Sequence, residues 1–287
     1  MSSAAQASSQ PDSEQRGQQL YDLGATSVFS LAADNRFVYT LYVPESLGKT
    51  ASPPRLVVAV HGTGRQFVDY RNAYAEFGRW NNCVILCPLF PIGVLGDGNR
   101  SGFKYIQEGD IRYDQVLLAM VDEVARKYDL DFSTFALTGF SGGGHFVHRF
   151  SYLHPERLWA LSVGAPGSVT LIDPSRDWWV GTRDLQARFG KALDLAALRR
   201  VPVHMIVGKV DLETWEITHK PGSRYYMEGA NDAGATRPER IQALKRSLEQ
   251  AGVRVTLDLV DNMSHQGLRS VEKVQAFLAA VIGGEIR

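Results

Sequence analysis

Short, nearly unbroken apolar runs recur along the chain, and segments with helical periodicity separate them. Continuous apolar character is typical of strands buried on both faces of a parallel sheet. In the segment 114–128, by contrast, the apolar residues fall on one face of a helix. The runs lie at residues 56–60, 83–86, 135–140, 158–163 and 201–207. This alternation predicts an α/β protein whose mostly parallel sheet has helices on both faces.

The two ends of the chain extend this sheet. Residues 28–31 and 37–43 flank a turn at 33–35 and predict an antiparallel hairpin. Residues 253–259 alternate strictly between apolar and polar, which predicts a strand with one exposed face near the sheet edge. A capping-box helix starting at Thr236 precedes this strand, and a final helix at 271–282 follows it. The result is an eight-stranded sheet in one domain, residues 20–287.

Composition and charge exclude several classes of protein. The 287 residues are 44% apolar and 22% charged, and 31 basic residues balance 31 acidic ones. A net charge of zero argues against a nucleic-acid partner. No run approaches the roughly 18 apolar residues of a membrane span, so no membrane partner is expected.

The first 19 residues are rich in Ser, Ala and Gln and predict a flexible tail. They lack the apolar core of a signal peptide, so a cytoplasmic location is expected. An exported protein whose signal had been removed would have the same sequence.

Residues 168–200 interrupt the regular alternation of strands and helices. The segment holds an Asp-Trp-Trp-Val-Gly stretch at 177–181 and a modest helical pattern around 185–198. An excursion of this length between strands is typical of a lid, a binding loop or a small subdomain. We expect a small lid-like insertion here.

The clearest chemical signal is Gly139-Phe140-Ser141-Gly142-Gly143-Gly144, which follows an apolar strand and precedes a helix. It matches G-x-S-x-G, the nucleophile elbow of α/β-hydrolases. The tight turn strains the serine backbone, and glycines on both sides prevent side-chain collisions. Ser141 is therefore the predicted nucleophile; the alternative is a glycine-rich turn with a bystander serine.

A nucleophilic serine needs a base and an acid that orients the base. His265 lies in the loop after the last strand, and Asp211 follows the strand at 201–207. The order Ser141, Asp211, His265 is the one expected of this fold, and all three lie beyond carboxyl ends of strands. Glu213 and Asp261 remain alternatives to Asp211.

The predicted oxyanion hole uses two backbone amides. The first is the N–H of Gly142, directly after the nucleophile. The second comes from His61-Gly62-Thr63-Gly64-Arg65, where we expect Thr63 to be the donor and Gly64 to be the alternative. His61 is expected to brace this loop through a hydrogen bond.

The other histidines have weaker claims to a role in the site. His145 and His148 are spaced i, i+3 and could share a metal, but no carboxylate or cysteine cluster accompanies them. We expect them to be packing or surface residues and predict no metal site. His204, inside an apolar strand, is expected to be a core residue.

Four residues are candidates for the substrate pocket. Trp178 and Trp179 in the insertion, together with Trp215, could form an aromatic wall. The alternative is that the tryptophans only attach the insertion to the body of the domain. His219, near Trp215, is also expected to line the pocket.

The chain resembles the α/β-hydrolase superfamily, in particular its compact esterase and polyhydroxybutyrate-depolymerase-like branch. The resemblance rests on His61-Gly62, the elbow at 139–144 and His154-Pro155-Glu156-Arg157, and it covers about residues 27–282. It implies an acyl-enzyme on Ser141 and no cofactor. The oxyanion loop reads His-Gly-Thr-Gly, which departs from the His-Gly-Gly-Gly of many lipase-like esterases.

The sequence thus predicts a serine esterase whose partner is a small-molecule or oligomeric ester. Two other hypotheses are an amidase or peptidase with the same triad, and a binding protein that kept the fold but lost catalysis.

Overall fold

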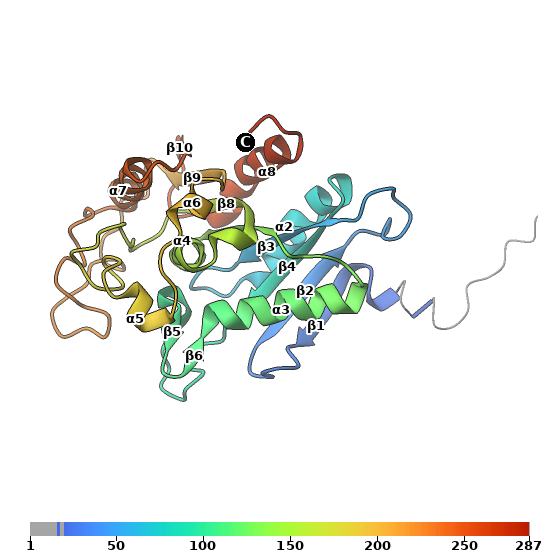
Figure 1. The fold of residues 1–287 in the computed structure, drawn as a ribbon, viewed down its shortest axis with the longest axis horizontal. Helices are drawn as coiled ribbons and strands as arrows, with labels where there is room; N and C mark the ends of the chain where they lie inside the picture. Colours follow the sequence, from blue (N-terminus) through green and yellow to red (C-terminus); the bar gives the residue numbers. More distant parts are fainter. Residues whose placement is uncertain (1–15, 18–19, 287) are drawn as a thin grey trace, which may run out of the picture.

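The structure, a computed structural model, describes residues 16–17 and 20–286, so the predicted tail lies almost entirely outside the described residues (Figure 1). Its centre is an eight-stranded sheet in the order β1-β2-β4-β3-β7-β8-β9-β10. These strands are β1 (Gly24–Ser30), β2 (Val38–Val43), β3 (Arg55–Val60), β4 (Cys83–Leu89), β7 (Phe135–Phe140), β8 (Leu158–Gly164), β9 (Val203–Gly208) and β10 (Val255–Val260).

The sheet is mostly parallel, as predicted. β1 and β2 form the expected antiparallel hairpin, and β2 is also antiparallel to β4. The other six strands run parallel to one another. A separate two-stranded ribbon, β5 (Gln107–Glu108) with β6 (Ile111–Arg112), was not predicted.

Helices cover both faces of the sheet. One face carries α2 (Phe67–Trp80) and α8 (Val271–Ile282), which contact each other, and the other carries α3 (Tyr113–Tyr128) and α4 (Gly142–Leu153) (Figure 1). For α2, α3 and α4 this division follows from right-handed crossovers, because the β3-to-β4 connection, which contains α2, moves in the reverse direction along the sheet from the connections that contain α3 and α4. The remaining helical elements are α5 (Leu185–Phe189), α6 (Leu195–Leu198), α7 (Arg237–Gln250), η1 (Gly102–Tyr105), η2 (Pro155–Arg157) and η3 (Gly267–Ser270).

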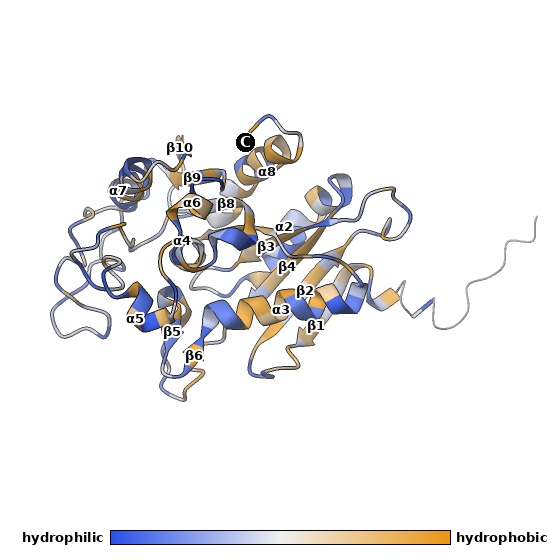
Figure 2. Cartoon of the chain, in the orientation of Figure 1, coloured by the Kyte–Doolittle hydropathy of each residue, from blue (hydrophilic) through white to orange (hydrophobic). Residues whose placement is uncertain are grey.

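The apolar runs form the interior, as Figure 2 shows by the hydrophobic colour of the central strands. Every residue of β7 and β9 is buried, whereas no residue of β10 at the edge is: Thr256 and Leu259 are exposed and the other four are half-buried, so the predicted strict alternation does not appear in its burial. The predicted capping box is present at Thr236, whose side chain accepts from the Glu239 amide. Within the described part of the chain, no helix is long and apolar enough to cross a membrane.

The insertion at 168–200 is partly built into the body of the domain. Its expected helical pattern becomes two short helices, α5 and α6. Val169, Trp178, Trp179 and Val180 are buried and belong to the same hydrophobic core as the sheet. Leu185, Phe189 and Leu198 of the second half belong to the same core, so both halves of the insertion contribute to it.

Candidate active site

Ser141 occupies a strained turn between β7 and α4. Its backbone has φ 57° and ψ −118°, a conformation that non-glycine residues rarely adopt. The flanking glycines are required by close backbone contacts: a Cβ on Gly143 would lie 2.3 Å from the Val60 carbonyl oxygen. A Cβ on Gly139 would lie 2.6 Å from the Gly143 carbonyl carbon. The turn therefore holds the Ser141 side chain at the wall of a cavity.

His265 and Asp211 meet at the carboxyl ends of β10 and β9. The His265 Nδ1–H donates to Asp211 Oδ2 at 2.7 Å, and the Asp211 side chain is completely buried. The His265 ring packs against Phe140, the residue before Ser141, with 5.0 Å between ring centroids. Its Nε2 is buried and has no hydrogen-bond partner among the described residues, Ser141 included. This nitrogen is thus a free acceptor close to the elbow.

The alternative acids do not contact His265. Asp261 is exposed and pairs with Lys209 at 2.7 Å, and the Glu213 side chain is exposed to solvent. Among the three acids considered, only Asp211 is hydrogen-bonded to the imidazole.

Arg237, at the start of α7, fixes the second oxygen of Asp211. Its Nη1 donates to Asp211 Oδ1 at 3.1 Å, and its Nη2 donates to Glu216 Oε2 at 2.8 Å. With one oxygen held by Arg237 and the other by His265, the Asp211 carboxylate has a fixed orientation. Arg237 was not predicted as a site residue. The only feature of the sequence that could have indicated it is its position directly after the helix cap at Thr236.

The loop after β3 places a backbone amide next to Gly142. A Cβ on Gly142 would lie 3.0 Å from the Thr63 nitrogen, whereas one on Gly64 would face the Gln66 side chain. This geometry favours Thr63 over Gly64 as the partner of the Gly142 amide. The Gly142 N–H starts α4 and has no partner within its helix.

His61 and Arg65 brace this loop. His61 Nε2 accepts from the Phe90 amide at 3.0 Å, and Arg65 Nη1 donates to the Thr63 carbonyl at 2.7 Å. Burial lowers the pKa of His61 to about 3, so the imidazole is neutral and can accept this bond. The predicted bracing role of His61 agrees with these contacts, whereas that of Arg65 was missed.

The histidines of α4 connect the elbow helix to the insertion. His145 Nε2 accepts from the Gly167 amide at 2.7 Å, and His148 Nε2 accepts from the Thr170 amide at 3.0 Å. Burial is the main cause that holds the pKa of both imidazoles well below its usual range. They are therefore neutral packing residues, as predicted.

His204 is likewise buried and bonded to Ser162 at 2.9 Å. Among the described residues, no three His, Cys, Asp or Glu side chains form a potential metal site.

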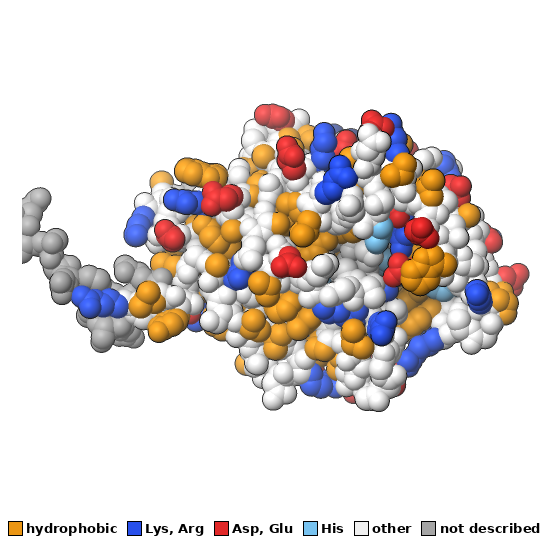
Figure 3. Space-filling view, turned by 180° about the vertical axis from the view of Figure 1, so that it is seen from behind, with side chains coloured by type: hydrophobic (Ala, Val, Ile, Leu, Met, Phe, Trp, Pro, Cys, Tyr) orange, Lys and Arg blue, Asp and Glu red, His pale blue; other side chains and the backbone are white. Residues whose placement is uncertain are grey.

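A cavity of about 310 Å³ opens beside Ser141. Its wall comes from the loop after β3 (residues 61–65), from η1 and from the long connection between β9 and α7. On the face drawn in Figure 3, histidine side chains reach the surface beside basic and acidic side chains. The main lining side chains are Lys104, Tyr105, His145, Glu216, His219, Tyr225 and Arg237.

The predicted pocket residues are only partly found there. His219 lines the cavity, but Trp215 is 76% exposed and does not, so that expectation is wrong. Trp215 lies only four residues after Asp211, but the chain there turns outward into solvent. Trp178 and Trp179 are buried behind the wall and do not line the cavity either.

The two buried tryptophans support the wall from behind. The Trp178 Nε1 donates to the Tyr105 carbonyl at 3.2 Å, and the Trp179 Nε1 donates to the Tyr225 carbonyl at 3.0 Å. The Trp179 ring also packs on His219 at 4.8 Å. Burial lowers the pKa of His219 to about 4. The interpretation that the tryptophans attach the insertion to the body fits these contacts better than a lining role.

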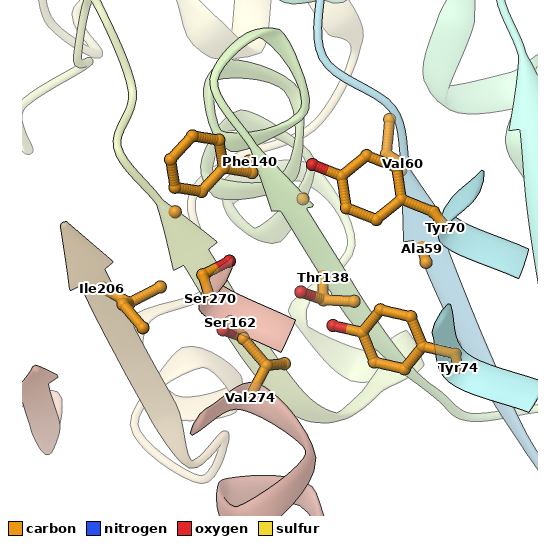
Figure 4. A pocket seen from close by; sticks show the side chains of 12 residues that line it. Ala59, Val60, Tyr70, Tyr74, Thr138, Phe140, Ser162, Ile206, Ser270 and Val274 are labelled. Atoms are coloured by element: carbon orange, nitrogen blue, oxygen red, sulfur yellow. The ribbon is translucent and has the colours of Figure 1, made fainter. Parts of the chain in front are cut away.

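A second, much smaller cavity lies under the elbow on the α2 and α8 side of the sheet (Figure 4). Its volume is about 10 Å³, which is no larger than one water molecule requires. Hydroxyl groups of Tyr74, Thr138, Ser162 and Ser270 surround it (Figure 4). Its size excludes it as a substrate site.

No protein-family model matches the chain, and no curated protein matches it in sequence. Solved structures do match it. Poly(aspartic acid) hydrolase-1 from Sphingomonas sp. KT-1 is 20% identical with a TM-score of 0.72, over 89% of this chain and 98% of that one. A poly(3-hydroxybutyrate) depolymerase from Bordetella parapertussis is 20% identical with a TM-score of 0.69, over 91% and 92%.

A third match is an S-formylglutathione hydrolase from Agrobacterium tumefaciens. It is 21% identical with a TM-score of 0.54, over 91% of this chain and 95% of that one. Likeness at this level of identity concerns the fold, and it agrees with the strand order and the strand–serine–helix elbow described above. The chain therefore has the α/β-hydrolase fold.

Proposed function

We propose that this protein is a serine hydrolase that cleaves carboxylic esters, with Ser141 as nucleophile, His265 as base and Asp211 as the acid that orients His265. Ser141 Oγ attacks the ester carbonyl carbon while its proton passes to His265 Nε2. The amides of Gly142 and Thr63 donate to the oxyanion that forms. The intermediate then collapses, and the alcohol leaves with the proton from His265.

The second half of the reaction repeats these roles with water. His265 Nε2 takes a proton from a water molecule, whose oxygen attacks the acyl carbon. As the tetrahedral intermediate collapses, its bond to Ser141 Oγ breaks, His265 returns the proton to Ser141 Oγ, and the acid is released. All of these steps use groups of this chain and water.

One observation carries the proposal. The 2.7 Å bond from His265 Nδ1 to Asp211 fixes the proton on Nδ1, which leaves the unpartnered Nε2 as a proton acceptor beside the elbow. In enzymes of this type the hydrogen bond between the nucleophile and its base is often longer in the absence of substrate. The lack of a hydrogen bond from Ser141 to His265 Nε2 is therefore compatible with these roles.

The structural neighbours favour an ester, because they include a poly(3-hydroxybutyrate) depolymerase and a ferulic acid esterase. A second candidate is an amide, since another neighbour is named for poly(aspartic acid), a polyamide. A cavity of about 310 Å³ is at the lower end for small-molecule sites and suits a small substrate or one unit of an oligomeric ester.

The test is a series of p-nitrophenyl esters from acetate to decanoate, measured with wild type and Ser141→Ala. Removing the nucleophile should lower kcat by about 10,000-fold or more. Ser133→Ala, an exposed serine on the loop before β7, should match wild type. Turnover by Ser141→Ala near the wild-type rate would refute the assignment. Cleavage of matched anilides with no cleavage of esters would favour the amide.

A further inference from the structure

Among the residues that line the cavity beside Ser141, basic side chains outnumber acidic ones, with Glu216 as the one acidic member, although the chain as a whole is neutral. Three basic residues line it. Arg224 is paired with Asp97 at 2.6 Å, and Arg237 is paired with Asp211 and Glu216. Lys104 lines the same cavity and makes no ion pair with any described residue. Its ammonium group is thus available to a ligand.

Two more cations lie buried behind the cavity wall. Arg149 and Arg240 are almost completely inaccessible to solvent, and each is bonded to neutral groups only. Arg149 donates to Thr170 Oγ1, Ser168 Oγ and the Lys104 carbonyl. Arg240 donates to Asn231 Oδ1 and to the carbonyl oxygens of residues 167, 217 and 234. Because no carboxylate in the described part of the chain pairs with them, their field extends into the cavity.

These cations also lower the pKa values of neighbouring titratable groups. Burial is the largest cause that lowers the pKa of both His145 and His219, and Lys104 and Arg149 lower it further in each case. Burial lowers the pKa of Lys104 itself to about 8. Glu216 across the cavity opposes this shift, while Arg65, Arg237 and Arg149 add to it. At neutral pH Lys104 remains mostly protonated.

Lys104 is also close to the reacting centre. A Cβ on Gly142 would lie 3.1 Å from Lys104 Cε and 3.0 Å from the Thr63 nitrogen. The lysine side chain therefore passes beside the two amides assigned to the oxyanion. A group bound to its ammonium would belong to the substrate itself, near the scissile bond.

We infer that the cavity selects esters that bear a carboxylate in the acyl or alcohol part, and that the Lys104 ammonium is the specificity-determining group that binds this carboxylate. The inference rests on the proposed function and narrows its substrate class. A monoanion fits better than a dianion such as a phosphate ester, because Glu216 on the same wall repels additional negative charge.

The test uses two pairs of matched esters. On the acyl side, mono-p-nitrophenyl adipate is compared with its methyl ester; on the alcohol side, 4-carboxyphenyl butyrate is compared with its methyl ester. The measured quantity is the ratio of kcat/KM for the charged member to that for the neutral member. In wild type this ratio should be about 10 or more in at least one pair, since a charge-assisted hydrogen bond contributes on this scale.

Variants of Lys104 assign the preference to one side chain. Lys104→Met keeps the length of the side chain and should lower the ratio about 10- to 100-fold. Lys104→Arg should retain most of it, and Lys49→Met, an exposed lysine far along the sheet, should leave it unchanged. A ratio near 1 in both pairs for wild type, or an unchanged ratio in a folded Lys104→Met, would overturn the inference.

A binding measurement separates this inference from the proposed function. Calorimetry with Ser141→Ala compares monomethyl adipate with dimethyl adipate. Tighter binding of the carboxylate that is lost in Ser141→Ala/Lys104→Met would support the site even if wild type hydrolysed no ester. Equal binding of both compounds, with esters still hydrolysed, would overturn the inference and leave the proposed function intact.

Discussion

The proposed catalytic corner and the proposed binding wall of the cavity are built in different ways. The catalytic corner, meaning Ser141, Asp211, His265 and the amides of Gly142 and Thr63, lies within a few residues of strand ends. The binding wall, meaning Lys104, Tyr105, Glu216, His219 and Tyr225, comes from η1 and from the irregular connection between β9 and α7.

The difference shows how one fold separates chemistry from specificity. Parallel strands bring their carboxyl ends to one edge, so short connections are enough to align the corner. The residues of the wall do not follow strand ends, so their positions depend on contacts among buried side chains. Tyr105 and Tyr225 stack at 4.0 Å, and Arg149 packs over Tyr105 at 4.7 Å and over Trp179 at 5.1 Å. Changes in the corner should affect every substrate equally, whereas changes in the wall should affect stability and selectivity.

After the loss expected for Ser141→Ala, the largest effect is expected in the corner, from Asp211→Asn. The amide cannot hold the proton on His265 Nδ1, so the base presents the wrong tautomer, and kcat/KM should fall about 1,000- to 10,000-fold. The fall should be the same for charged and neutral esters. Asp261→Asn, which removes an exposed acid paired with Lys209, should change activity less than about twofold. The reverse ranking of these two variants would make Asp261 the acid.

Arg149→Met tests whether the wall depends on its buried cation. The change removes the Arg149 donors from the Ser168 and Thr170 hydroxyls and from the Lys104 carbonyl, and it removes the cation from the two aromatic rings. The free energy of unfolding should fall by about 3 kcal/mol. Denaturant unfolding measures this, with Arg246→Met on the exposed face of α7 as the control. A loss no larger than that of Arg246→Met would show that the wall does not need Arg149.

A smaller effect is expected from pH. Burial lowers the pKa of Lys104 to about 8, so its ammonium is charged below that pH and neutral above it. The preference for a carboxylate-bearing ester should therefore fall about tenfold between about pH 7 and about pH 9. The ratio of the two kcat/KM values measures this directly, because an effect of pH on the catalytic steps common to both esters cancels. A constant ratio across this range would contradict the role of Lys104.

The difference between the corner and the wall also explains which site residues could be predicted from the sequence. Ser141, Asp211 and His265 were found because each follows an apolar or alternating strand, and strand ends are visible in periodicity. The helix at 271–282 and the strand at 135–140 agree with the structure residue for residue. Asp211 was separated from Asp261 only by the structure, since both follow a strand.

The wall could not be predicted in this way. Lys104 lies in a four-residue 3₁₀ helix, and Arg237 and Arg149 bind partners more than 20 residues away in sequence. No periodic pattern marks such contacts. Trp215 was misplaced for the same reason, because closeness to Asp211 along the chain does not determine the direction of an irregular loop.

The most direct test of the account is to trap the acyl-enzyme. Wild type is mixed with excess p-nitrophenyl acetate, quenched in acid within the first turnovers and digested, and the peptides are analysed by mass spectrometry. The account predicts an acetyl group on the peptide that contains Ser141, located on that serine, and none in Ser141→Ala. Ester turnover with the acetyl group on another residue, or with no adduct under conditions that show a burst of p-nitrophenol, would contradict it.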